Sequence, residues 1–133
     1  MTAVLSNNAT SQHEWLDQLT ALMTEITGWC NTRGWAVHGA AKPISEASFG
    51  TYSAPTLQIR TSNGGIVYVE PVARYVTAAD GLVDMYAWPS LRRLLLIRKE
   101  GSWHIRTDSG VPLPWKWSEE SFTQAVEALT STE

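Results

Sequence analysis

The first regular pattern of hydrophobic positions lies between residues 11 and 34. Its apolar residues recur at spacings of four and three, as on one face of an α-helix: Trp15, Leu19, Leu22, Ile26 and Trp29. The sequence SQHE at 11–14 has the form of a capping box and predicts that this helix begins at Ser11. Gly34 can take the left-handed conformation that ends a helix. We therefore predict an amphipathic helix, preceded by a flexible segment at residues 1–10.

From Trp35 onward the hydrophobic period changes to two, which is typical of half-buried strands. We predict strands near residues 35–41, 56–61, 66–75, 82–88, 92–99 and 102–107. Turn-forming sequences separate several of them: SNGG at 62–65, ADG at 79–81 and EG at 100–101. Because these links are too short for crossover helices, an antiparallel meander is expected. Residues 42–55 show no clear period and are predicted to form a long connection.

A second helix is predicted near the C-terminus. Pro112 and Pro114 keep the chain extended, and Ser118 is a good N-cap for a helix that starts with two glutamates. Trp117 and Phe122 occupy the positions of a hydrophobic staple. The apolar stripe of this helix consists of Phe122, Ala125, Val126 and Leu129.

These elements predict an α+β fold. It comprises an N-terminal helix, an antiparallel meander of about five to six strands and a C-terminal helix, with both helices packed on one sheet face. The chain has 133 residues, so residues 11–133 are expected to form a single domain. No apolar run approaches the roughly 20 residues that span a bilayer, and we find no secretion signal. The single cysteine, Cys30, falls on the apolar helix side, which favours a buried thiol in the reducing cytoplasm.

Known catalytic and metal-binding motifs are missing from the sequence. The three histidines, His13, His38 and His104, are scattered, and neither H-x-x-x-H nor C-x-x-C occurs, so no metal or other cofactor is predicted. There is no G-x-S-x-G nucleophile motif, and we expect a protein without enzymatic activity. A net charge of −3 makes nucleic acid an unlikely main partner.

One set of residues could support acid–base chemistry if the strands brought it together. Glu70, Asp84 and His104 all lie on predicted strands. However, a two-residue turn at 80–81 would place Asp84 opposite Thr77 rather than beside Glu70. Solvated charges on an outer sheet face are therefore the favoured interpretation.

The hairpin around EG at 100–101 gives the most detailed prediction. A two-residue turn pairs Lys99 with Ser102, Arg98 with Trp103, Ile97 with His104, Leu96 with Ile105 and Leu95 with Arg106. One face then carries core residues, namely Leu94, Leu96, Trp103 and Ile105. The other mixes aliphatic and cationic residues: Arg93, Leu95, Ile97, Lys99, His104 and Arg106.

The second face of this hairpin suggests a function. Five of the ten Lys and Arg residues lie between 92 and 106, while both helices are acidic on their polar sides. An open sheet face with aliphatic residues and a basic rim has the composition of an interface. Our preferred hypothesis is a small, non-enzymatic, cytoplasmic interaction module of the adaptor, inhibitor, immunity or chaperone type. It would bind an acidic protein partner, or a second copy through Leu95 and Ile97 as a homodimer.

Three other interpretations remain open. The aliphatic residues of this face could instead be covered by the C-terminal helix or by residues 42–55. The protein could be a small-ligand domain or enzyme, with an aromatic pocket between the sheet and the N-terminal helix lined by Trp15, Trp29, Tyr52, Tyr68, Tyr86 and Trp88. It could also bind single-stranded nucleic acid, with Arg93, Lys99 and Arg106 on phosphates and Trp103 or Tyr86 stacked on bases. The predicted pairing places Trp103 on the opposite face, which counts against this last interpretation.

Overall fold

The computed structural model describes residues 2–47, 50–74 and 79–131, with side chains from residue 12 onward. The chain forms two helices and seven strands. In order these are α1 (Thr2–Thr32), β1 (Ala36–Glu46), β2 (Gly50–Arg60), β3 (Ile66–Ala73), β4 (Gly81–Trp88), β5 (Arg93–Lys99), β6 (Ser102–Thr107), β7 (Pro112–Lys116) and α2 (Glu119–Thr130).

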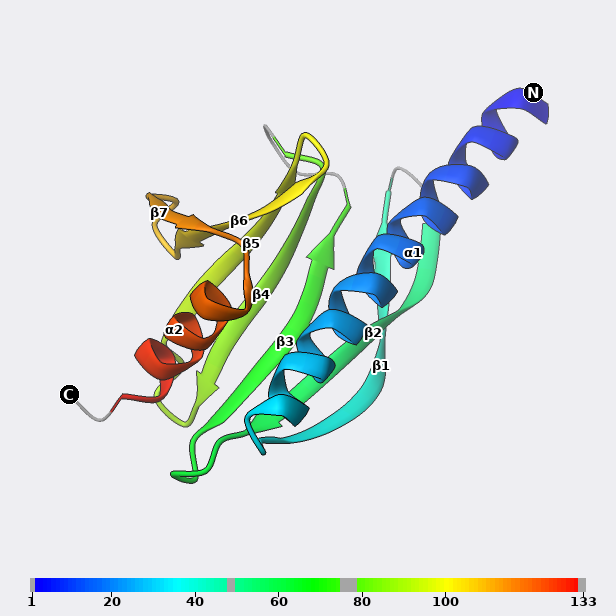
Figure 1. The fold of residues 1–133 in the computed structure, drawn as a ribbon. Coiled ribbons are helices and arrows are strands. Elements are labelled where there is room, and N and C mark those ends of the chain that lie inside the picture. The colour runs from blue at the N-terminus through cyan, green and yellow to red at the C-terminus, as the bar shows by residue number, and fades with distance from the viewer. Residues whose placement is uncertain (1, 48–49, 75–78, 132–133) are drawn as a thin grey trace.

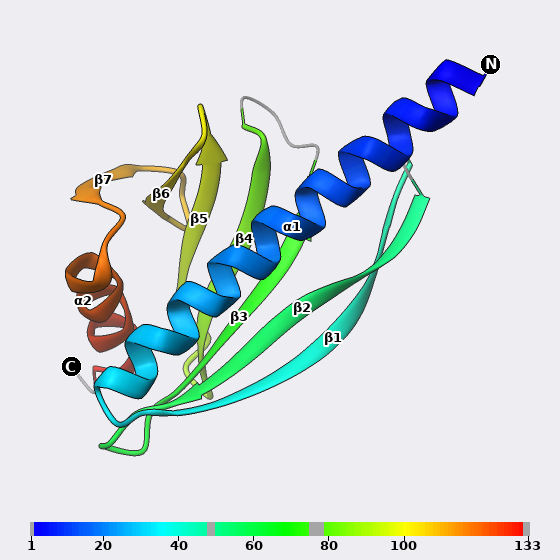
Figure 2. The ribbon, with the colours of Figure 1, turned by 45° about the vertical axis from the view of Figure 1, so that its right-hand side comes forward.

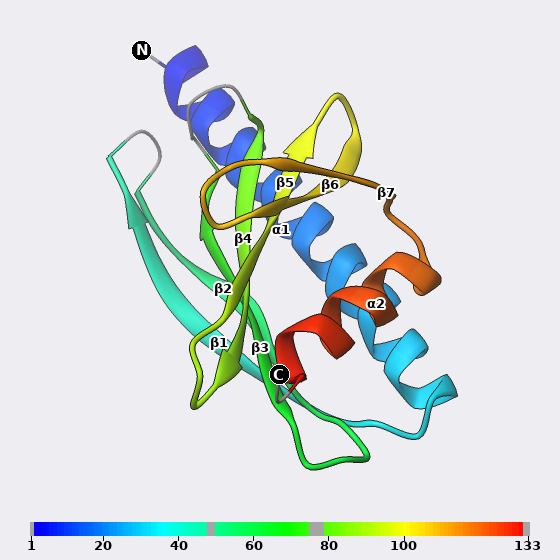
Figure 3. The ribbon, with the colours of Figure 1, turned by 90° about the vertical axis from the view of Figure 1, so that its left-hand side faces the viewer.

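The strands form one antiparallel sheet in which spatial order follows chain order, from β1 at one edge to β7 at the other. Both helices lie on the same face of this sheet (Figure 1); in the view turned by 90°, α2 and the C-terminal half of α1 stand to the right of the strands (Figure 3). The predicted α+β meander is confirmed. The additional strand is β7, which contains the extended stretch with Pro112 and Pro114.

Helix α1 crosses the sheet diagonally, and its N-terminal part projects beyond the strands (Figure 2). It begins at Thr2 and passes through the SQHE sequence, so the prediction of a helix start at Ser11 is wrong. The predicted end is confirmed: Gly34 has a φ of +74°, and the Trp35 N–H donates to the Cys30 carbonyl oxygen at 2.9 Å. The flexibility of residues 1–10 stays a prediction.

The prediction of a long connection at 42–55 is also wrong, because β1 and β2 continue through most of it. Their register is unbroken from Ala36 opposite Arg60 to Glu46 opposite Gly50. Pro43 lies opposite Ser53, and Pro55 lies opposite Ala41. Both pairs consist of odd-numbered residues, so the two prolines occur in pairs of the same kind. An antiparallel ladder alternates between hydrogen-bonded and non-hydrogen-bonded pairs. In a non-hydrogen-bonded pair the N–H does not point to the opposite strand, so a proline there removes no hydrogen bond between the two strands.

A continuous core joins both helices to the inner sheet face. Its largest fully buried members include Trp15 of α1, Met85 of β4 and Phe122 of α2. The two helices are joined by aromatic contacts, with ring centroids 5.6 Å apart for Trp29 and Phe122. Cys30 is buried as predicted, and burial raises the pKa of its thiol to about 12.

The start of α2 follows its sequence signals. Ser118 is the N-cap and accepts a hydrogen bond from the Ser121 N–H, while Ser121 Oγ accepts one from the Ser118 N–H at 2.9 Å. The predicted staple is present, with Trp117 and Phe122 ring centroids 5.9 Å apart. The predicted apolar stripe of α2 is buried along its whole length.

Candidate interface on the outer sheet face

The face of the sheet turned away from the helices is called the outer face here. On β5 and β6 the structure has the predicted pairing, including Leu95 opposite Arg106 and Ile97 opposite His104. The alternate residues Leu96, Trp103 and Ile105 belong to the core. All six predicted binding residues therefore point to the outer face: Arg93, Leu95, Ile97, Lys99, His104 and Arg106.

The six residues differ in how far solvent reaches them. Arg93, Lys99 and His104 are exposed, and Leu95 and Arg106 are half-buried. Ile97 is only 7% exposed although it is not part of the core cluster, so its neighbours on the outer face cover it. Neither α2 nor residues 42–55 provide this cover, since α2 packs on the inner face and most of 42–55 extends the sheet. Of the two aliphatic residues at the centre of the predicted surface, only Leu95 is therefore accessible to a partner.

The outer face contains a hollow of about 550 Å³ beside Leu95. Its apolar lining consists of Val72, Leu82, Leu91 and Leu95, and its charged lining of Asp84, Arg93 and Asp108. Leu91 and Val72 are 55% and 37% exposed, unlike the core residues on the inner face of β3 and β4. Sequence reasoning missed Leu91 because it lies in the turn between β4 and β5 and has a φ of +63°, outside the strand pattern.

Two cations flank a pair of carboxylates on the outer face. Lys42 Nζ lies 3.7 Å from Glu70 Oε1, and Arg93 Nε lies 3.8 Å from Asp84 Oδ2. Glu70 and Asp84 are directly opposite each other on β3 and β4, so the prediction that they are apart is wrong. Thr77, the partner predicted for Asp84, lies outside the described residues.

Burial raises the pKa of Asp84, and its neighbour Glu70 raises it further. Arg93 and Lys42 act in the opposite direction, because a cation favours the charged carboxylate. Next to this pair, the rings of Tyr68 and Tyr86 stack with centroids 5.2 Å apart, and the Arg93 guanidinium lies 5.6 Å from the Tyr86 ring centroid. Burial and the adjacent Glu70 raise the Tyr86 pKa to about 12. Tyrosine and arginine side chains of this kind are enriched at interfaces.

The structure does not bring the acid–base candidates into one pocket. His104 lies opposite Ile97, which in turn lies opposite Leu82, so the histidine is two strands away from Asp84 on β4. Among the described residues, no group of three or more His, Cys, Asp or Glu side chains is arranged to hold a metal ion.

The predicted aromatic pocket is not formed by the predicted residues. Trp15 is fully buried in the core, where its Nε1–H donates to the Tyr52 hydroxyl at 3.0 Å. Tyr68 and Tyr86 alternate with core residues and so lie on the outer face, away from α1. Trp88 is 54% exposed at the end of β4.

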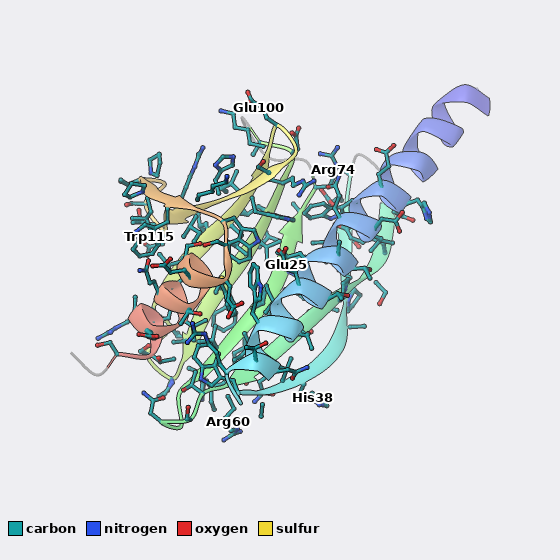
Figure 4. All side chains as sticks on the ribbon, viewed as in Figure 1. Glu25, His38, Arg60, Arg74, Glu100 and Trp115 are labelled. Carbon is teal, nitrogen blue, oxygen red and sulfur yellow. The ribbon has the colours of Figure 1, made fainter. Side chains whose placement is uncertain are left out.

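A different cleft, of about 670 Å³, separates α1 from the β5–β6 hairpin and β7. Trp103 and Trp117 line it together with Glu25, which is labelled on α1 in Figure 4 and accepts a hydrogen bond from Trp117 Nε1 at 2.8 Å. The Arg98 guanidinium lies 5.2 Å from the Trp103 ring centroid. The sequence could not reveal this cleft, because its walls come from both ends of the chain.

Within the described residues, no helix is long and apolar enough to cross a membrane. Comparison with known proteins adds no further constraint on the site: no protein-family model, curated protein or solved structure matches the chain.

Proposed function

We propose that the protein is a non-enzymatic interaction module whose outer sheet face binds a protein partner. The observation that carries this proposal is the hollow beside Leu95, which neither α1 nor α2 lines and to which Leu91 and Val72 contribute exposed apolar surface. An antiparallel sheet can leave one face in water, but that face then normally carries polar side chains. A hollow lined by four aliphatic residues and three charged ones can accept a partner side chain on its aliphatic part and pair a partner charge at Asp84, Arg93 or Asp108.

The charges around the hollow favour an acidic partner. Arg93 borders the hollow, and Lys99, His104 and Arg106 extend the same face over β5 and β6. Arg106 is half-buried on this face, and within the described part of the chain its buried Nε has no acceptor. Partner carboxylates along this side would offer acceptors to the cations, whereas Asp84 and Asp108 would orient basic groups at the hollow.

Two further parts of the proposal rest on single features. The absence of enzymatic activity is supported by the separation of His104 from Glu70 and Asp84. Cytoplasmic location is supported by Cys30, whose buried thiol has no second cysteine in the chain to pair with. Adaptor, inhibitor, immunity and chaperone roles all use a surface of this kind.

The test is affinity capture from native-host lysate with matched charge variants. Leu91→Glu places a carboxylate in the hollow, whereas Val111→Glu makes the same kind of change at a residue that is 56% exposed and does not line the hollow. We expect a specific protein to be retained by the wild type and by Val111→Glu, and retention to fall at least about tenfold for Leu91→Glu, as for loss of an interface hot spot. Retention of the same protein by Leu91→Glu would contradict the proposal.

A second candidate function is small-ligand binding in the cleft between α1 and the β5–β6 hairpin. It is favoured by Gln18, which lines the cleft and whose Oε1 is buried with no donor among the described residues. Trp103 and Trp117 would report on such a ligand through their fluorescence. An emission change that Gln18→Leu abolishes by removing the Oε1 acceptor, at unchanged stability, would support this candidate; unchanged emission across a metabolite panel would count against it.

A further inference from the structure

The two edges of the sheet are unequal. The edge strand β7 has five residues, of which Pro112 and Pro114 lack an N–H, and its register with β6 is irregular. The opposite edge strand β1 has eleven residues in an unbroken ladder with β2. Proline and irregular pairing are common means of protecting an edge against a further strand. The β7 edge is protected in this way and the first half of β1 is not.

The unprotected stretch of β1 is residues 36–41, Ala-Val-His-Gly-Ala-Ala. It contains no proline and no Lys, Arg, Asp or Glu, and every side chain except that of Val37 is exposed. Figure 4 marks His38 on this strand, at the margin of the sheet. Small side chains on both faces leave the main chain accessible to another strand.

The prolines indicate which main-chain groups face outward. Pro43 and Pro55 cost the β1–β2 ladder no donor when the odd-numbered β1 residues form its non-hydrogen-bonded pairs. The N–H and C=O groups of these odd residues then point away from β2. Before Pro43 interrupts the series, three residues offer both groups to the open edge: Val37, Gly39 and Ala41.

We propose that a second copy of the chain occupies this edge, with β1 pairing antiparallel to β1 of its partner about a two-fold axis at Gly39. Val37 of each copy lies opposite Ala41 of the other, and the two Gly39 residues face each other. Each of the three resulting pairs exchanges two main-chain hydrogen bonds. His38 faces Ala40, and Lys42 faces Ala36, so no like charges are opposed.

The ends of the paired segment fit this register. One step beyond, Pro43 would lie opposite Trp35, and neither residue has an N–H to give. Pro43 lacks one, and the Trp35 N–H already donates to the Cys30 carbonyl oxygen at the end of α1. A register moved to centre on Ala41 would place Pro43 within the paired segment and lose donors. The segment that pairs is thus the segment whose donors are free.

The unequal edges also explain why the assembly stops at two copies. A chain with two open edges would add copies indefinitely, whereas a chain with one open edge forms a closed, symmetric dimer. This inference is independent of the proposed function, because the hollow on the outer face is formed by β3, β4, β5 and the turns beside them and not by β1.

The first test is the molar mass in solution, measured by light scattering for the wild type and two lysine variants. Gly39→Lys places two like charges opposite each other at the axis, and a Cβ at this position meets only the Thr56 carbonyl oxygen at 4.0 Å, an ordinary contact. Ser45→Lys adds the same charge at another exposed position of β1, beyond Pro43 and outside the paired segment. We expect dimeric wild type and Ser45→Lys, and monomeric Gly39→Lys. Circular dichroism checks that each variant is folded.

The second test is a symmetric disulfide. Residues directly opposite in a hydrogen-bonded pair have Cα atoms about 5.5 Å apart, within the roughly 4.4–6.8 Å that a disulfide spans. Gly39→Cys should therefore form a covalent dimer on mild oxidation, Ser45→Cys should not, and the buried native Cys30 should not compete.

Three results would overturn the inference: monomeric wild type at all concentrations, assemblies larger than two copies, or a Gly39→Lys variant that remains dimeric. If the wild type is monomeric and binds an extended peptide at this edge, the occupant of the edge is that peptide and not a second copy. The two variants separate this inference from the proposed function. Gly39→Lys should lose the dimer and keep capture of the partner, whereas Leu91→Glu should keep the dimer and lose capture of the partner.

Discussion

The two faces of the sheet are formed by alternate residues of the same strands, yet they are filled differently. On the inner face, Val83 and Met85 of β4 are fully buried beneath the helices. On the outer face, the alternating residues Leu82, Asp84 and Tyr86 remain partly accessible, and aliphatic and charged side chains together line a hollow. The inner face stabilises the fold, and the outer face has apolar surface that the fold leaves open.

The largest expected difference between the faces is in the cost of truncating an aliphatic side chain. Ile105 is 1% exposed in the core, so Ile105→Ala should lower the free energy of unfolding by about 3 kcal/mol. Leu95→Ala, at a half-buried outer position, should cost about 1 kcal/mol or less, because little cavity is created. Urea unfolding measures both losses, provided that the dependence of the unfolding free energy on urea concentration is the same for the variants and the wild type. Equal losses would show that the outer face is packed as tightly as the core.

A smaller difference is expected for adding a methyl group to a strand glycine. A Cβ on Gly81 would collide with the indole of Trp15, which is itself fully buried, so Gly81→Ala should cost about 1–3 kcal/mol. Gly39→Ala at the β1 edge is the matched control and should be neutral or stabilising by up to about 1 kcal/mol. Thermal unfolding distinguishes the two variants. A neutral Gly81→Ala would mean that α1 is free to move away from β4.

The smallest effect concerns the pH dependence contributed by Asp84. Burial raises its pKa in the folded protein above the ordinary value of 3.8, so the folded state binds this proton more tightly than the unfolded state. Its contribution to stability is therefore full below the ordinary pKa and is lost as pH rises through the raised value. Asp84→Asn removes this dependence, and its stability relative to the wild type should increase over that pH window. A difference that decreases with pH would show that the ion pair with Arg93 dominates.

Local patterns predicted the parts of the fold that local chemistry determines. The turn at Glu100 and Gly101, both with positive φ, set the register of β5 and β6 residue by residue. Ser118 and the residues that follow it set the start of α2. In each case the signal and the structure it specifies lie within a few residues of each other.

The wrong predictions concern features that depend on the rest of the molecule. Residues 42–55 show no clear hydrophobic period, yet β1 and β2 continue through most of them because the pairing of the two strands, which the period does not reveal, holds them in the sheet. The neighbours of Asp84 depended on the length of the β3–β4 connection, which the DG pair alone did not determine. The burial of Ile97 is set by side chains on the adjacent strands, and the hollow by a turn residue, Leu91.

The most direct test of the central claim is site-specific photocrosslinking with the captured partner. A photoreactive amino acid replaces Leu91 in one variant and Val111 in another, two apolar residues of nearly equal exposure. The account predicts that the partner crosslinks through position 91 and not through position 111. Crosslinking through position 111 alone, with binding retained in both variants, would place the interface elsewhere and contradict the assignment of the outer-face hollow.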